Sequence, residues 1–368
     1  MTHISEQKVL LDITMKILNV VGARPNFMKI APIAEEMKKA RDLSGVLVHT
    51  GQHYGEGMSD VFFRELGIPV PDVHLNVGSG SHAEQTARIM MEFEKICLRE
   101  KPEMVLVVGD VNSTMACAIV GAKLCIPVAH VEAGLRSFDR EMPEEINRVV
   151  TDTLSSIFFT TARDGDENLK REGVNPEKIF FVGNVMIDTL LKQRQKAAAL
   201  PMEKPDQYAL LTLHRPSNVD DKNVLGPILE AVQEISHTLP VLFPIHPRTA
   251  KSIQDFGFTM NGIRMMDPLG YLEFLNLQAN ATMVLTDSGG LQEETTILRV
   301  PCLTLRNNTE RPVTITHGTN IMVGTDKSRI LDAFRRIMNG EWKPSGPPEL
   351  WDGRAAERIV RVIREFHA

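Results

Sequence analysis

The chain has 368 residues, of which 43% are hydrophobic and 24% charged, a composition typical of a globular protein with room for two domains. The formal net charge of −6 argues against a nucleic-acid partner, and no apolar run approaches the length of a membrane span. Residues 1–15 mix acids with a lysine, so we expect a short extension on a cytoplasmic protein rather than a signal peptide. The cysteines lack metal-site spacing, and we expect reduced, partly buried thiols at Cys97, Cys117, Cys125 and Cys302.

Short apolar runs alternate with amphipathic stretches along the whole chain. The runs are rich in Val, Ile and Leu and alternate little with polar residues, which is typical of strands buried on both faces of a parallel sheet. The first set is Lys16–Val21, Val46–His49, Met104–Val108, Val128–Val131, Ile157–Thr160 and Ile179–Val182. The second set is Tyr208–Leu213, Val241–Ile245, Ile263–Met266, Met283–Thr286, Cys302–Leu305 and Ile321–Val323. Helical periodicity falls between them, at Lys29–Lys39, Gln85–Leu98, Ser113–Leu124, Asp164–Glu172 and Leu225–His237.

This alternation predicts an α/β protein with two doubly wound domains. We place them at residues 16–187 and 188–352, because the helical run Asp188–Leu200 is followed by two prolines in polar company. Residues 353–368 form a final helix. Ligands of open α/β sheets bind beyond the carboxyl ends of the strands, so the residues that follow each run are the candidates for a site.

Two strand ends of the first half carry charged residues. After the first run, a glycine turn holds Arg24 and Lys29, which suit an anion-binding helix start or equally a surface turn. This turn matches neither a dinucleotide fingerprint nor a Walker loop. After the third run stands Asp110, which could face a cleft or simply cap the next helix.

The fourth run of the first half leads into a group of acids. Glu132 follows the strand, and Glu144 and Arg148 share one face of the next helix because they are four residues apart. That pair is either an exposed ion pair or a carboxylate oriented by a guanidinium. Together with Asp110, these acids could divide the roles of a general acid and a general base.

The second half offers groups that suit a phosphate. His214 ends its first run and either meets phosphate or packs structurally. Ser288, Gly289 and Gly290 precede a helix, where bare backbone can approach an anion, and Glu294 lies one turn further on. A glycine turn with an N-terminal acid explains the same residues equally well. Arg311 adds a cation at another strand end. The pattern predicts a nucleotide diphosphate on the second domain, with its attached group facing the acids of the first.

Seven segments in family order carry a resemblance that covers nearly the whole chain from Met15. They read GARPNFMKIAP, VVGDVNST, HVEAGLRS, MPEEINR, LTLHRP, LTDSGGLQEE and NTERP. The chain resembles the non-hydrolysing UDP-N-acetylglucosamine 2-epimerases, and it resembles their hydrolysing relatives less. The resemblance implies two Rossmann-like domains in the GT-B arrangement, the last helix packing back on the first domain, and a homodimer. It implies no cofactor, no metal and no membrane partner.

In such enzymes the C2 proton is removed as UDP leaves, and UDP then adds back to an enzyme-bound 2-acetamidoglucal. By resemblance, Asp110, Glu132 and Glu144 are the acid and base candidates, Arg148 orients them, and His214 holds the diphosphate. The remaining substrate-binding candidates are Arg24, Lys29, Ser288, Gly289, Gly290 and Arg311 for the nucleotide, Glu294 for ribose, and the vicinity of Tyr271 and Phe274 for uracil.

The chain departs from the family at a few positions. Many members have Glu where this chain has Asn26 and Val313, which leaves the fine substrate geometry open. Some bacterial members use long polar side chains near Gln52 and Gly78–His82 to bind an activating second substrate molecule. Gln52 is kept but the others are not, so we predict weak or absent activator control. A GT-B glycosyltransferase, an epimerase of another UDP-amino sugar or uronate, and a non-enzymatic UDP-sugar-binding protein are the alternative functions.

Overall fold

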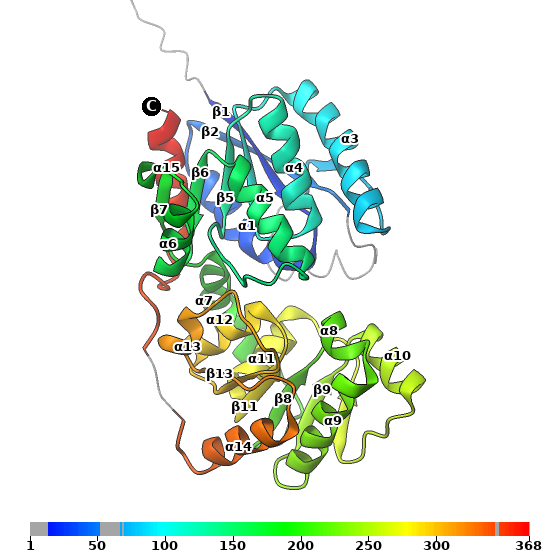
Figure 1. The fold of residues 1–368 in the computed structure, drawn as a ribbon. Coiled ribbons are helices and arrows are strands. Elements are labelled where there is room, and N and C mark those ends of the chain that lie inside the picture. Colours follow the sequence, from blue (N-terminus) through cyan, green and yellow to red (C-terminus); the bar gives the residue numbers. More distant parts are fainter. Residues whose placement is uncertain (1–13, 52–66, 68–69, 343–345, 368) are drawn as a thin grey trace, which may run out of the picture.

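The computed structural model describes residues 14–51, 67, 70–342 and 346–367 and contains two doubly wound domains (Figure 1). In the first domain the strand order is β3-β2-β1-β4-β5-β6-β7, and in the second it is β10-β9-β8-β11-β12-β13. All strand pairs of the described residues are parallel. The predicted fold class is therefore confirmed.

The strands of the first domain are β1 (Met15–Val21), β2 (Leu43–His49), β3 (Val73–His74), β4 (Met104–Val108), β5 (Val128–Val131), β6 (Ile157–Thr160) and β7 (Ile179–Phe181). Those of the second are β8 (Ala209–Thr212), β9 (Val241–Pro244), β10 (Ile263–Met266), β11 (Met283–Thr286), β12 (Cys302–Thr304) and β13 (Asn320–Met322). Each predicted run overlaps one of these strands, with ends that differ by up to three residues. The edge strand β3 was not predicted, because its two residues are too few and too exposed to form an apolar run.

The helices up to the second domain are α1 (Arg24–Met37), α3 (His82–Glu100), α4 (Asn112–Lys123), α5 (Pro143–Leu154), α6 (Arg163–Arg171), the 3-10 turn η1 (Pro176–Lys178) and α7 (Val185–Ala198). Those that follow are α8 (Pro216–Val219), α9 (Lys222–Ser236), α10 (Pro247–Phe256), α11 (Tyr271–Asn280), α12 (Gly289–Leu298), α13 (Val313–Thr316), α14 (Lys327–Met338) and α15 (Ala355–His367).

The apolar central strands explain the layered cores. In β4, Leu106 belongs to the core shared with α1, α7 and α15, whereas Val105 and Val107 belong to the core shared with α3 and α4. A strand buried on both faces cannot alternate apolar with polar residues, which is why β4 is the unbroken run MVLVV.

Helix α7 joins the two domains. Near its start, Thr189 donates a hydrogen bond to the carbonyl of Met28 in α1, and near its end the carbonyl of Ala197 accepts one from Asn276 in α11. The boundary predicted between residues 187 and 188 falls inside this continuous helix. Asp188 of α7 also accepts the backbone N–H groups of Ala355 and Ala356, and this cap starts α15 beside the first domain (Figure 1).

Candidate active site

A pocket of about 470 Å³ opens between the carboxyl ends of the two sheets. In each domain it lies where the strand order reverses, at β1 and β4 in the first and at β8 and β11 in the second. Such switch points leave a crevice between diverging loops, which is where doubly wound sheets bind ligands. The pocket lining includes the predicted residues Lys29, Asp110, Glu144, His214, Tyr271, Phe274, Ser288, Gly289, Gly290, Glu294 and Arg311.

Asp110 is held at the pocket by a buried guanidinium. Arg148 Nη1 lies 2.5 Å from Asp110 Oδ2, and its Nη2 lies 2.7 Å from Glu145 Oε2. Burial raises the pKa of Asp110, but the charge of Arg148, helped by Lys29 and Arg311, outweighs it and holds that pKa below its usual value. Asp110 is therefore an ionised, oriented carboxylate.

Two interpretations of this region were wrong. The N-cap of α4 is Val111, so Asp110 does not cap that helix. The partners of Arg148 are Asp110 and Glu145, and not Glu144, because Arg148 turns inward under the strand ends while Glu144 lines the pocket. The spacing of residues along one helix could not show that Asp110, from the loop after β4, binds the guanidinium of Arg148.

Glu132 forms a second buried ion pair, with Lys29, in which Nζ and Oε2 are 2.5 Å apart. Glu132 follows β5 with a φ of +73°, a conformation that costs a non-glycine residue on the order of 1 kcal/mol and often marks a functional site. Lys29 lines the pocket and Glu132 lies behind it. The ammonium predicted to meet phosphate is thus bound to a carboxylate in this structure.

Gly109 makes the approach of these groups possible. Its φ is +69°, and a Cβ there would lie 2.9 Å from Lys29 Nζ and 3.2 Å from Asn26 Nδ2. Asn26 joins two strand ends, since its oxygen accepts the N–H groups of Gly22 and Ala23 and its amide donates to the carbonyl of Val108. Asn26 is therefore a buried residue beneath the pocket that connects the ends of β1 and β4.

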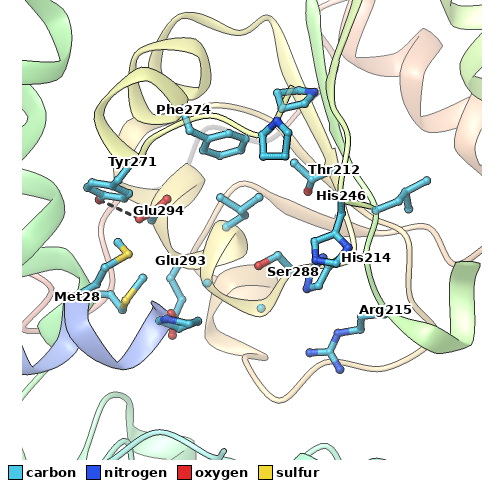
Figure 2. A pocket seen from close by; sticks show the side chains of 18 of the residues that line it. Met28, Thr212, His214, Arg215, His246, Tyr271, Phe274, Ser288, Glu293 and Glu294 are labelled. Carbon is cyan, nitrogen blue, oxygen red and sulfur yellow. Dashed lines mark hydrogen bonds between the residues drawn. The ribbon is translucent and has the colours of Figure 1, made fainter. Parts of the chain in front are cut away.

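On the opposite wall, Asp287 fixes His214. Asp287 Oδ2 accepts the backbone N–H groups of His214 and Arg215, each at 2.9 Å, and its Oδ1 lies 2.8 Å from His214 Nδ1. With Nδ1 bound to a carboxylate, Nε2 is the nitrogen left for a ligand. The His214 side chain is 44% exposed and lies beside Ser288 and His246 in Figure 2, so it is not a packed structural residue.

Helix α12 begins at the same wall. Ser288 is its N-cap, and a Cβ on Gly289 would lie 2.5 Å from Arg311 Nη1, so only glycine lets Arg311 approach this helix start. Arg311 is anchored by Glu310 and by Glu293, whose Oε1 lies 2.8 Å from its Nε. Burial raises the pKa of Glu293 to about 7, although the charge of Arg311 opposes this.

Glu294 receives a hydrogen bond from the hydroxyl of Tyr271, at 3.1 Å. Figure 2 shows Tyr271 and Phe274 on one side of this end of the pocket, next to Glu294. Burial raises the pKa of Glu294 to about 7, and the Tyr271 hydrogen bond only partly offsets this.

Sequence reasoning missed several residues of the site. Three of them hold predicted residues in place. Asp287 holds His214, Glu145 holds Arg148, and Glu293 holds Arg311. Asp287 and Glu293 stood inside a motif already singled out, but their partners are distant in sequence. His246 directly follows the predicted run Val241–Ile245 and lines the pocket, so the strand-end rule that selected His214 could have selected it too. The side chain of Arg24 and the whole of Gln52 lie outside the described residues, and their predicted roles remain predictions.

Loops of both domains, which lead into the lining residues Glu144 and Glu310, meet at a contact that we call the rim. Asn308 Nδ2 donates to Asp139 Oδ2 at 2.9 Å, and Arg306 Nη2 lies 3.8 Å from Met142 Sδ. The loop with Asp139 is held in turn by Glu145, which accepts the N–H groups of Ser137 and Phe138. The rim contact thus connects to the Arg148–Asp110 pair.

Two Rossmann-like domains facing each other across such a pocket define the GT-B class of α/β fold. No helix of the described residues is long and apolar enough to cross a membrane. The free cysteines Cys97, Cys117 and Cys302 are buried and Cys125 is exposed, as predicted.

The family model described as UDP-N-acetylglucosamine 2-epimerase matches residues 35–364. The chain is 45% identical to the UDP-N-acetylglucosamine 2-epimerase of Methanocaldococcus jannaschii, over 95% of this chain and 99% of that protein. A crystal structure of the M. jannaschii enzyme with UDP-GlcNAc and UDP superposes with a TM-score of 0.88, at 45% identity, over 95% of this chain and all of that one. The UDP-2,3-diacetamido-2,3-dideoxy-D-glucuronate 2-epimerase of Pseudomonas aeruginosa is 42% identical over 96% of this chain and all of that protein. This chain belongs to the UDP-N-acetylglucosamine 2-epimerase family and is an isomerase.

Proposed function

We propose that this enzyme inverts C2 of UDP-GlcNAc and so interconverts it with UDP-ManNAc without hydrolysing it. The observation that carries the proposal is the composition of one pocket. Asp110 and Glu144, backed by Glu132, lie on one wall, and a glycine-rich helix start with an oriented histidine lies on the other. Removal of the unactivated C2 proton needs a base from the first wall, and a diphosphate leaving group needs the donors of the second.

The proposed reaction balances without an external reagent. A carboxylate takes the C2 proton, the C–H electron pair forms the C1–C2 double bond, and the C1–O bond breaks with its electrons on UDP. The bound glycal then receives a proton on its other face at C2 while a UDP oxygen re-forms the bond at C1. Asp110, Glu132 and Glu144 are the groups assigned to proton transfer, and Arg148 orients Asp110.

The second wall is assigned to UDP. The N–H groups at the start of α12, with Arg311 and His214 Nε2, would hold the diphosphate through the step in which it carries most charge. Glu294 would accept hydrogen bonds from the ribose, and the uracil would lie near Tyr271 and Phe274. Closure of the rim would keep water from the glycal.

Proton NMR with UDP-GlcNAc in deuterated buffer, without metal or acceptor, tests the proposal. We expect UDP-ManNAc carrying deuterium at C2. Free ManNAc with UDP would contradict the non-hydrolysing reaction, and transfer that needs an added acceptor would favour a glycosyltransferase.

A C2 epimerisation of a UDP-2,3-diacetamido uronate is the second candidate, because the P. aeruginosa relative of that name is nearly as similar as the M. jannaschii one. The two sugars compared at equal concentration decide between them through their kcat/KM ratio. A homodimer stays a prediction of the family resemblance, and a cytoplasmic location stays a prediction from the sequence. Analytical ultracentrifugation tests the homodimer.

A further inference from the structure

A histidine beneath the pocket has no role in the reaction as assigned above. His130 lies in β5 and its side chain has no exposed surface. Its Nδ1 lies 2.6 Å from Asp152 Oδ1 in α5, and its Nε2 lies 2.9 Å from the carbonyl oxygen of Gly109. It does not line the pocket.

Both partners of His130 are acceptors. A carbonyl oxygen can only accept, and Asp152 already accepts from the Gly134 N–H at 3.1 Å and from Arg136 Nη1, 2.7 Å from its Oδ2. Burial raises the pKa of Asp152, but the neighbouring His130 and Arg136 charges hold it below its usual value. Asp152 is therefore a carboxylate. The two ring nitrogens of His130 thus bridge the Asp152 carboxylate and the Gly109 carbonyl oxygen, and because that carbonyl can only accept, Nε2 is the nitrogen that donates to it.

Each acceptor is connected to one candidate catalytic carboxylate. The Gly109 carbonyl leads to Asp110, and Asp152 holds the segment that follows Glu132. Gly109 immediately precedes Asp110, and its own N–H donates to Val131 in β5 at 3.0 Å. Since the peptide group is planar, fixing both the N–H and the carbonyl of Gly109 fixes where Asp110 begins. At the other end of the pair, Asp152 holds the N–H of Gly134, two residues after Glu132.

We propose that His130 and Asp152 are positioning residues that set the separation of the Asp110 and Glu132 carboxylates. This inference rests on the proposed function, because it assigns the pair to that reaction. Neither residue touches substrate. Their effect comes from geometry, since a displacement of about 1 Å at a reacting group can cost about 100-fold in rate.

Two neutral substitutions of His130 test its hydrogen bonds to Gly109 and Asp152 separately. In His130→Gln the amide nitrogen takes the place of Nε2 and can still donate to Gly109, whereas in His130→Asn it takes the place of Nδ1 and reaches only Asp152. We expect His130→Asn to lower kcat about 10- to 100-fold with KM within about twofold of wild type. His130→Gln should keep kcat within about threefold. The control is Glu172→Gln, at the surface end of the same network, which should leave both constants unchanged.

Equal kcat in the two His130 variants, or a change in KM alone, would overturn the proposal. Melting temperatures identify a variant that merely unfolds. A ¹⁵N-histidine NMR spectrum of the wild-type protein at pH 8 then serves as the second measurement, with His130→Gln for assignment. A proton on Nε2 of His130 supports the hydrogen bond to the Gly109 carbonyl, and an unprotonated Nε2 contradicts it. If the wild-type enzyme does not turn over UDP-GlcNAc, the proposed function fails, but this spectrum still decides whether the hydrogen bond exists.

Discussion

The two walls of the pocket hold their charges in different ways. On the first domain, Asp110 and Glu132 are each paired with a buried cation from a different element, Arg148 and Lys29. On the second domain, the ligand-facing groups are donors, namely a glycine-rich helix start, a half-exposed histidine and the anchored Arg311. The first wall presents carboxylates that are already paired with cations, whereas the second presents donors for a ligand to occupy.

This difference separates chemistry from binding. Preorganised carboxylates lower the barrier because they need no rearrangement during proton transfer, and contacts to the ribose, which is unchanged in the reaction, supply affinity. Changes at the carboxylates of the first wall should therefore act on kcat, and changes at the ribose end of the second wall on KM. Variants on each wall test this difference, and their expected activities depend on the proposed reaction.

The largest effect is expected for Asp110→Asn. The amide keeps the shape of the side chain and can still bind Arg148 through its oxygen, but it cannot take a proton. We expect kcat to fall about 10²- to 10⁴-fold with KM within a few-fold of wild type, measured by NMR progress curves. Glu141→Gln, an exposed acid near the same wall, is the control. A variant with normal kcat would remove Asp110 from the proton-transfer groups.

The contrast between the walls also marks the limit of sequence reasoning. The sheets could be predicted because runs such as MVLVV in β4 record burial on both faces, and strand-end positions such as Asp110 and His214 follow from the fold. Ion-pair partners could not be predicted. Glu144 and Arg148 have ideal helical spacing, yet the guanidinium binds Asp110 and Glu145, since burial and a competing loop outweigh a surface pair worth a few tenths of a kcal/mol.

Glu294 gives the next largest effect, on stability. Its pKa is raised from an ordinary 4.5 to about 7, so the folded protein keeps this proton to higher pH than the unfolded chain does. The contribution of Glu294 to stability is therefore greatest below about pH 4.5, falls as the pH rises to about 7, and then stays level, a loss on the order of 3 kcal/mol from this group. Glu294→Gln should make this decline shallower between pH 5 and 8, measured by urea unfolding. The exposed Glu203→Gln is the control, and an unchanged slope would contradict the raised pKa.

The same residue tests binding on the second wall. At pH 8, above its raised pKa of about 7, Glu294 accepts ribose hydrogen bonds as a carboxylate in the proposed complex, and a neutral amide does so less strongly. Glu294→Gln should raise KM about tenfold with kcat nearly unchanged. Tyr271→Phe leaves the carboxylate and removes only its hydroxyl partner, so it should raise KM by less, about threefold. A fall in kcat with constant KM would move Glu294 to the chemical step.

The smallest effect concerns the rim, where the walls meet. Asn308→Ala removes the hydrogen bond to Asp139, worth about 1 kcal/mol, and so should shift the closed form about fivefold toward the open one. Opening during the lifetime of the glycal lets UDP and glycal escape, so the ratio of free UDP to epimerised product should rise up to fivefold while epimerisation continues. Asp139→Asn is the matched control, because its amide oxygen can still accept from Asn308. Equal leakage from Asn308→Ala and wild type would show that this contact does not retain the intermediate. Closure would then depend on α7, which is bonded to α1 at one end and to α11 at the other.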